Sequence, residues 1–289
     1  MTVIDAHQHL WAVGADPGDF GDYGWLDARV LDPIARTFTE ADLEPMLVAA
    51  GVDATVMVQS ANTVSDTAAM LAVADRWSRV RGIVGWAPLL QPEQTAATID
   101  LWRTDRRLVG VRHLIHDEPD PDWIMQPAVL ESLALLADAG LTYDVIGVLP
   151  RHLEHAITIA SRLPGLRLVL DHLGSPPIRD AGWQPWADLM AAAAEHPNIS
   201  VKLSGLGTCA EWETWQPSDL QPYVEHVLTL FGADRVMFGG DWPVCVLAGD
   251  YARMWAGVTS LLAGLTDAER ARVLGGTATQ FYRLPDGRS

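Results

Sequence analysis

The feature that most constrains the fold is a regular alternation of short β-branched runs with longer helix-like segments along the chain. Such alternation is typical of a parallel sheet whose strands are joined by crossover helices. Eight runs are candidate strands: Val3–His9, Thr55–Ser60, Gly82–Ala87, Val109–Ile115, Thr142–Ile146, Leu166–Asp171, Ile199–Ser204 and Arg235–Gly239.

The segments between these runs begin as helices commonly do, with Pro in the first turn or Ser/Thr ahead of acidic residues. They are Thr39–Ala50, Thr67–Ser78, Pro92–Trp102, Pro127–Ala139, Pro150–Arg162, Trp186–Glu195 and Pro217–Phe231. Eight such units predict an α/β fold, a closed (β/α)8 TIM barrel that forms a single domain over residues 1–289. The alternative is an open doubly wound sheet, but His9-Leu10-Trp11 stands where that fold needs a glycine-rich phosphate turn.

Composition excludes some classes of partner. The chain has 37 acidic and 20 basic residues, for a formal net charge of −17. A polyanion of this size repels phosphate backbones and anionic lipid, so we expect a small-molecule substrate and neither nucleic acid nor membrane as partner. No signal peptide or long apolar run is evident, and Cys209 and Cys245 form neither a metal motif nor a disulfide framework. These features predict a reduced, cytoplasmic protein, and they leave the oligomeric state open.

The strongest local motif is His7-Gln8-His9, at the end of the first candidate strand. Residues two apart in a strand face the same side, so His7 and His9 project together. At the carboxyl end of a barrel strand that side is the mouth of the barrel, where two imidazoles can hold a metal or polarise a carbonyl.

Two other strand ends carry titratable side chains. His172 follows the sixth candidate strand, and Asp241 follows the eighth, behind Gly-Gly and ahead of Trp-Pro. In a barrel both positions lie on the same rim as the histidine pair. An aspartate in such a turn is an odd choice for packing alone. We therefore interpret these groups as candidates for catalysis.

Candidate substrate-binding residues lie on three strands. Lys202 is the only lysine of the chain and lies in an apolar strand, which suggests a need for a compact ammonium group. Arg112 offers forked donors to a hydroxyl-rich or carboxylate ligand. Alternation places Arg112 and its neighbour His113 on opposite faces unless a bulge intervenes. Trp86 and Trp242 fall at strand ends, where indole faces suit sugar rings or cap the core.

Substrate choice is expected to depend on loops. The insertion over residues 12–38 is rich in Gly and Asp and is predicted to be an active-site loop over the mouth. The loops over residues 117–126 and 175–184 are further candidates. Their acidic residues favour a neutral substrate over a strongly anionic one.

Five motifs in this order resemble the amidohydrolase superfamily, and most closely its lactonase-like branch, which includes sugar lactonases and a pyrone-dicarboxylate lactonase. The resemblance runs from Asp5 to about Tyr282. The motifs that carry it are Ile4–Trp11, Gly110–His113, Leu170–Gly174, Val201–Gly205 and Gly239–Pro243.

The resemblance implies a (β/α)8 barrel that hydrolyses a cyclic ester. It gives His7, His9, His172 and Asp241 as catalytic residues and as the ligands of any bound metal. Relatives with two metals carry a bridging lysine or glutamate on strand four and a histidine on strand five. Neither matches here, so a two-metal centre is not expected. The resemblance leaves open whether the chain uses one divalent metal, with Zn²⁺ favoured, or none.

Together these observations predict a lactonase that opens a lactone ring, with an aldonolactone as the favoured substrate. Asp241 would activate water, and the three histidines, directly or through one Zn²⁺, would polarise the carbonyl. Lys202, Arg112 and His113 would bind substrate oxygens, with Trp86 or Trp242 over the ring. The alternatives are a zinc-dependent decarboxylase of an unsaturated or aromatic acid, and a non-catalytic binding barrel.

Overall fold

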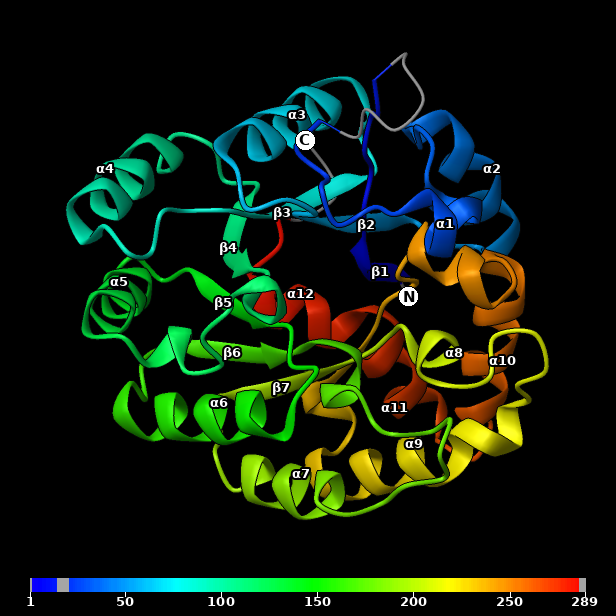
Figure 1. Cartoon of the computed structure of the whole chain (residues 1–289). Helices are drawn as coiled ribbons and strands as arrows, with labels where there is room; N and C mark the ends of the chain where they lie inside the picture. Colours follow the sequence, from blue (N-terminus) through cyan, green and yellow to red (C-terminus); the bar gives the residue numbers. More distant parts are fainter. Residues whose placement is uncertain (1, 15–20, 286–289) are drawn as a thin grey trace.

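Parallel strands surround a central axis in the order of the chain (Figure 1). The computed structural model describes residues 2–14 and 21–285. Within these residues the sheet has eight strands: β1 Ile4–Gln8, β2 Ala54–Val58, β3 Val80–Gly85, β4 Leu108–His113, β5 Thr142–Val145, β6 Arg167–Leu170, β7 Ile199–Leu203 and β8 Val236–Phe238. The predicted (β/α)8 barrel is confirmed, and each strand overlaps the run that predicted it.

The sheet closes between its first and last strands. His9 N–H donates to the carbonyl oxygen of Trp242 at 2.7 Å, and Asp241 N–H donates to that of His7 at 2.7 Å. These bonds lie beyond the end of β8, so closure involves the segments that carry the predicted site residues.

Most helices form a ring outside the barrel, whereas α12 lies across one end of it (Figure 1). The α-helices of the described residues are α1 Ala28–Leu31, α2 Glu40–Ala50, α3 Val64–Arg76, α4 Pro92–Trp102, α5 Pro127–Asp138, α6 Pro150–Arg162, α7 Trp186–Ala194, α8 Leu206–Cys209, α9 Pro217–Phe231, α10 Tyr251–Leu261, α11 Asp267–Ala271 and α12 Thr277–Tyr282. Short 3₁₀ turns follow β6 at Asp171–Gly174 and β8 at Val244–Ala248. The predicted bounds of α4, α6 and α9 agree residue for residue with the structure. The sequence patterns did not predict α10, α11 and α12, which follow the last strand.

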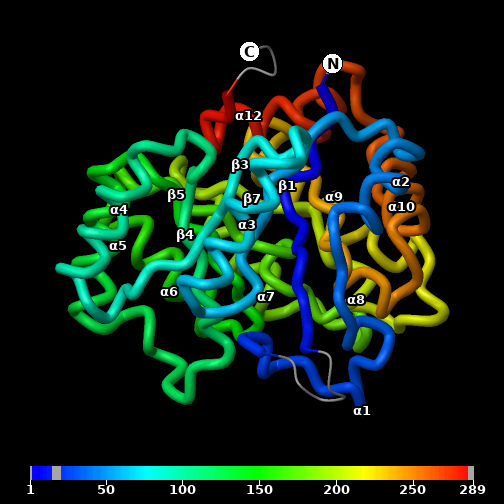
Figure 2. The backbone as a smooth tube through the Cα atoms, turned by 90° about the horizontal axis from the view of Figure 1, so that it is seen from above, coloured from blue at the N-terminus to red at the C-terminus, as the bar shows by residue number. Residues whose placement is uncertain are grey.

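The two ends of the barrel differ. Helix α12 lies across the end where the strands begin, and α1 lies at the opposite end (Figure 2). Phe281, Tyr282 and Leu284 pack with residues of β1 and β2 in one apolar cluster. Helix α12 therefore covers the barrel interior at this end, and the described residues leave it accessible where the strands finish.

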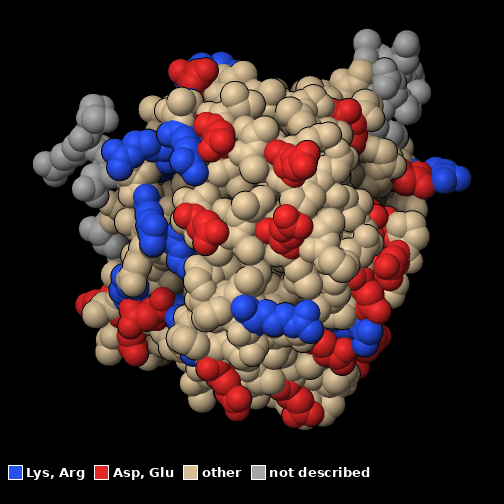
Figure 3. All heavy atoms as spheres, turned by 90° about the vertical axis from the view of Figure 1, so that its left-hand side faces the viewer, with Lys and Arg blue, Asp and Glu red and all other residues tan. Residues whose placement is uncertain are grey.

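Charged side chains of both signs lie on the outer surface of the barrel (Figure 3). On the face that carries α4 and α5, acidic and basic side chains are interspersed, without a continuous basic band (Figure 3). Among the described residues, the helices are all too short or too polar to cross a bilayer.

Candidate active site

A cavity of about 380 Å³ opens at the ends of the strands. Active sites of (β/α)8 enzymes lie at this end of the barrel. Its lining combines titratable groups with apolar side chains: His9, Trp25, Ser60, Arg112, Leu114, His116, Ile146, Val148, His172, Ser175, Thr208, Cys209, Asp241 and Val244.

Two histidines and one aspartate converge at the base of this cavity. His7 Nε2 lies 3.2 Å from His9 Nε2, and each of these nitrogens lies 3.6 Å from Asp241 Oδ1. His172 Nδ1 lies 4.0 Å from Asp241 Oδ2. The structure therefore brings together the four residues predicted as catalytic. His7 is fully buried beneath His9 and Asp241.

The hydrogen-bond partners of His9 fix its tautomer. His9 Nδ1 lies 2.7 Å from the carbonyl oxygen of Val58, which can only accept a hydrogen bond. Burial lowers the pKa of His9 to about 3, so the ring is neutral at pH 7. Its one hydrogen is therefore on Nδ1, and Nε2 presents a lone pair toward His7 and Asp241.

The rim backbone is strained where it presents these groups. His172 and Asp241 both have φ of 53°, in the left-handed region that non-glycine residues rarely adopt. Ser204 Oγ lies 2.9 Å from His172 Nδ1 and orients that ring. Such strain persists only where surrounding contacts enforce it, and it is common at functional sites.

Below His7 lies a network of buried charges. Lys202 is fully buried, and its Nζ lies 2.5 Å from Asp144 Oδ2, 3.1 Å from Asp171 Oδ1 and 3.0 Å from His7 Nδ1. Tyr282 in α12 donates to Asp144 Oδ2 at 2.7 Å. Lys202 thus reaches the cavity only through other side chains. Its predicted contact with substrate oxygens has no direct path in this arrangement.

The network sets the charges of its members. Burial alone would raise the pKa of Asp171, but Lys202, His7 and Arg112 outweigh it and hold that pKa well below the usual value. Burial, reinforced by Lys202, lowers the pKa of His7 well below its usual value. We therefore take Asp171 as ionised and His7 as neutral at pH 7.

Burial also changes the pKa of Asp241, the candidate base. Burial raises this pKa, and the nearby His172 and Arg112 lower it by less than burial raises it. A carboxylate with a raised pKa is a better proton acceptor than an exposed aspartate.

The remaining predicted ligand residues divide between the cavity and its surroundings. Arg112 lines the cavity, and its Nη1 lies 3.1 Å from Asp171 Oδ2. His113 points the other way, as strand alternation predicts, and stacks on Trp123 with ring centroids 3.9 Å apart. Trp86 Nε1 donates to His113 Nδ1 at 3.0 Å. Trp242 is fully buried. The structure thus brings only Arg112 of this group to the cavity wall, together with His116.

The predicted loops contribute unequally. Trp25, from the 12–38 insertion, lines the cavity, and its Nε1 donates to the carbonyl oxygen of Ser60 at 2.7 Å. Residues 15–20 of that insertion lie outside the described residues. Ser175 lines the cavity from the 175–184 loop. The described lining includes no residue from 117–126.

Sequence reasoning missed several members of the site. Asp144 and Asp171 were not assigned, although alternation along β5 turns Asp144 inward and Asp171 directly precedes His172. Thr208 and Cys209 follow β7 in α8 and face the cavity. Burial raises the pKa of the Cys209 thiol to about 12, so it is not a ready nucleophile.

The donor set fits a single divalent metal. One ligand atom from each of His7, His9 and Asp241 lies within 4.8 Å of the others, and a second such group is His7, Asp171 and His172. His7 belongs to both groups. The His9 Nδ1 bond to Val58 is the outer contact that a metal-bound histidine commonly makes. Three protein ligands with a free position are typical of catalytic zinc.

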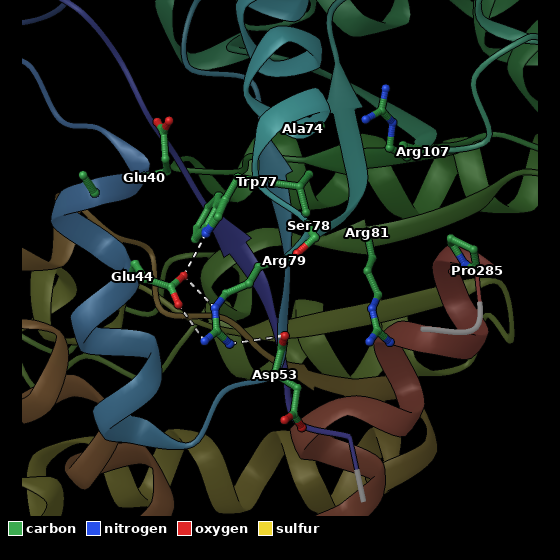
Figure 4. Close-up of a pocket in the computed structure, with 12 residues that line it drawn as sticks. Glu40, Glu44, Asp53, Ala74, Trp77, Ser78, Arg79, Arg81, Arg107 and Pro285 are labelled. Atoms are coloured by element: carbon green, nitrogen blue, oxygen red, sulfur yellow. Dashed lines mark hydrogen bonds and ion pairs between the residues drawn. The ribbon is translucent and has the colours of Figure 1, made fainter. Parts of the chain in front are cut away.

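A second hollow, of about 1020 Å³, lies at the opposite end of the barrel (Figure 4). Its charged side chains largely satisfy one another. Arg79 Nε lies 2.7 Å from Glu44 Oε2, and Trp77 Nε1 donates to the same oxygen at 2.8 Å. No titratable cluster of the catalytic kind lines it, so the cavity at the strand ends is the candidate site.

Comparisons with known proteins agree with this geometry. The amidohydrolase family model matches residues 4–284. An L-fucono-1,5-lactonase of Burkholderia ambifaria is 39% identical over 97% of this chain and 95% of its own length. An L-fucono-1,5-lactonase of Burkholderia multivorans is 34% identical over 98% of this chain and 96% of its own length.

A solved structure gives the same result. A zinc-bound amidohydrolase from Burkholderia multivorans superposes with a TM-score of 0.91 and 32% identity, covering 99% of this chain and 100% of that one. The barrel, the cluster at its strand ends and the match along nearly the whole chain lead to one conclusion: this protein belongs to the amidohydrolase family.

Proposed function

We propose that this protein is a lactonase that hydrolyses the cyclic ester of a sugar acid. The observation that carries the proposal is the convergence of His7, His9, His172 and Asp241 at the base of one cavity. Lactone hydrolysis needs a base for water, a group that polarises the carbonyl, and a proton for the departing ring oxygen. This cluster can supply all three.

Asp241 acts as the base. Its carboxylate lines the cavity, accepts a proton from the attacking water, and returns that proton to the ring oxygen as the C–O bond breaks. Water's oxygen becomes part of the new carboxylic acid, which releases water's second proton to the solvent and leaves as a carboxylate, and the former ring oxygen becomes a hydroxyl group. Its raised pKa suits both transfers.

The histidines and Arg112 polarise the carbonyl group of the lactone. Groups that donate hydrogen bonds to the developing oxyanion lower the barrier by about 3 kcal/mol each. His172 and Arg112 both line the cavity near Asp241. One divalent metal, held by His7, His9 and Asp241, would supply the same polarisation as a Lewis acid.

The cavity wall points to a substrate with an apolar end. Leu114, Ile146, Val148 and Val244 line the cavity together with the polar side chains of Arg112, Ser60 and Thr208. A sugar lactone with a methyl group in place of one hydroxymethyl group suits a lining that mixes apolar and polar side chains. L-fucono-1,5-lactone, the substrate named for two relatives, has this character.

We also propose that the enzyme works in the cytoplasm on a small molecule alone. Cys209 and Cys245 are both free thiols, as expected in a reducing compartment. Nucleic acid is disfavoured as a partner by the net charge of −17.

A hydrolysis assay on paired lactones tests the function. We expect acid release from a 6-deoxy-L-aldonolactone, measured with a pH indicator, and a kcat/KM about tenfold lower for the analogue with a terminal hydroxyl, since a hydrophobic pocket rejects an added hydroxyl weakly. The assay is run before and after exhaustive chelation. If the folded protein hydrolyses none of the lactones, the proposal is contradicted. Release of carbon dioxide from an aromatic acid would support the decarboxylase alternative.

The pH profile provides a second prediction. Only the ionised carboxylate of Asp241 can accept a proton, and burial raises its pKa. Activity is therefore expected to be present above this raised pKa and lost as the pH falls through it. The acid limb of kcat/KM should lie above the value near 4 of an exposed aspartate. A profile that stays flat down to pH 4 would exclude Asp241 as the base.

A further inference from the structure

Trp25 is the largest apolar side chain in the wall of the cavity. Among the described residues that line this cavity, it is the only phenylalanine, tyrosine or tryptophan. Its side chain is half-buried, so part of the indole is open to a ligand. The two tryptophans expected over the substrate ring are engaged elsewhere, because Trp86 donates to His113 and Trp242 is fully buried.

Two contacts fix the orientation of this indole. Trp25 Nε1 donates to the carbonyl oxygen of Ser60 at 2.7 Å. The buried ring of Trp11 packs against Trp25 in a T-shaped arrangement, with ring centroids 5.3 Å apart and an interplanar angle of 89°. An indole held both at its N–H and against a second ring has little freedom to turn, so it presents a preformed apolar surface to the cavity.

One buried carboxylate anchors the surroundings of Trp25. Asp66, in the first turn of α3, is only 2% exposed. Its Oδ1 accepts a hydrogen bond at 3.1 Å from the hydroxyl of Tyr23, two residues before Trp25. Its Oδ2 accepts at 3.0 Å from the N–H of Ser60, whose carbonyl holds the indole. Asp66 therefore joins the insertion to the end of β2.

Burial makes this anchor stronger than the other contact of the same segment. Tyr23 is 7% exposed, so loss of its partner would leave a buried hydroxyl unsatisfied. Asp22 also ties the insertion to the β2–α3 loop, accepting from Thr63 Oγ1 at 3.1 Å, but this bond is exposed and competes with water. The position of Trp25 thus depends mainly on Tyr23 and Asp66.

We propose that Trp25 is a substrate-binding residue whose indole packs against the ring of the bound lactone, and that Asp66 is a positioning residue that holds Trp25 there through Tyr23 and Ser60. The C–H groups of a sugar ring are apolar, and contact with an indole removes them from water. This contact is the same before and during the reaction, so it contributes to KM rather than to kcat. The identity of the ligand rests on the proposed function.

Trp25→Ala tests the contact with substrate. We expect KM for a 6-deoxy-L-aldonolactone to rise about tenfold with kcat nearly unchanged, because the variant loses a large apolar contact. Trp77→Ala is the matched control, since Trp77 is also half-buried and donates from Nε1, to Glu44 at 2.8 Å, at the opposite end of the barrel (Figure 4). A rise in KM no larger than that of Trp77→Ala would overturn the assignment of Trp25.

Three variants test the role of Asp66. Asp66→Ala should raise KM as Trp25→Ala does, and Asp66→Asn should restore most of the loss, because an amide can accept from Ser60 N–H and donate to the Tyr23 hydroxyl. Tyr23→Phe keeps the ring, removes one hydrogen bond and should raise KM about threefold. Wild-type KM in Tyr23→Phe would remove the anchor from this role, whether or not Asp66→Ala folds.

A ligand-binding measurement separates this inference from the reaction itself. In protein labelled with 5-fluorotryptophan, the ¹⁹F signal that Trp25→Ala lacks belongs to Trp25. The probe is the corresponding 1,5-lactam, in which an N–H replaces the ring oxygen and hydrolysis is resisted. We expect the lactam to shift the Trp25 signal and not that of Trp77. Tyr23→Phe should move the Trp25 signal before any ligand is added.

The outcomes distinguish the two proposals. A wild-type enzyme that hydrolyses no lactone contradicts the proposed function, and the Trp25 signal then decides the inference alone: a shift with lactam supports it. A Trp25 signal that saturating lactam leaves unmoved overturns the inference, even if the lactones are hydrolysed.

Discussion

Replacement of Asp241 by Asn is expected to lower kcat/KM by about 10²- to 10⁴-fold, the range that general acid–base groups contribute. Asparagine keeps the size of the side chain but cannot accept the proton of the attacking water. Asp241 lines the cavity and is buried, and its carboxylate neighbours in the described part of the chain are the side chains of His7, His9 and His172. The loss should therefore appear in kcat, with KM and the melting temperature nearly unchanged.

Asp100→Asn is the matched control, because it makes the same chemical change on exposed helix α4, where Asp100 faces Arg103 at 3.2 Å. It should retain wild-type activity. Activity of Asp241→Asn within a few-fold of wild type would remove this carboxylate from the proton transfers and leave the histidines or Arg112 to activate the water.

The sequence predicted the barrel well, because its strands are defined by local composition. Each of the eight strands overlaps a predicted run, and α4, α6 and α9 begin at prolines that mark the first turn. The helices α10, α11 and α12 were missed because no further strand follows them to reveal another βα unit. Helix α12 matters most, since it seals one end of the barrel.

The rim residues were predictable for a related reason. The parallel strands of a barrel all end on the same side, so residues that directly follow strands gather there without any knowledge of the loops. His9, His172 and Asp241 follow strands and His7 lies at the end of β1, and the structure brings all four together.

The position of a side chain along the barrel axis could not be predicted from the sequence. Alternation turned Lys202 inward, but its height relative to His7 depends on the stagger of β7 against β1, which no single strand encodes. The buried pairing with Asp144 and Asp171 follows from that stagger. Likewise, the sharp turn at Asp241, with φ of 53°, sends the next side chain, Trp242, away from the cavity.

The backbone at Gly205 passes very close to the side chains of His172 and Asp241. Gly205 has φ of +61°, and a Cβ there would lie 2.6 Å from His172 Nδ1 and 2.8 Å from Asp241 Oδ2. These atoms cannot tolerate such contacts, so Gly205→Ala must displace both side chains. We expect about 10²-fold lower kcat/KM, as a misplacement near 1 Å produces. Backbone strain of about 1–2 kcal/mol and overpacking of about 1–3 kcal/mol should also lower the free energy of unfolding.

Gly51→Ala separates the two causes, because Gly51 has φ of +69° but no atom within 4 Å of its would-be Cβ. It carries the backbone strain alone, so it should destabilise the chain by about 1–2 kcal/mol and leave kcat/KM unchanged. Denaturant unfolding and lactone hydrolysis of both variants give the comparison. If Gly205→Ala loses no more activity than Gly51→Ala, the spacing of His172 and Asp241 does not limit the reaction, and the strained rim backbone serves the fold rather than catalysis.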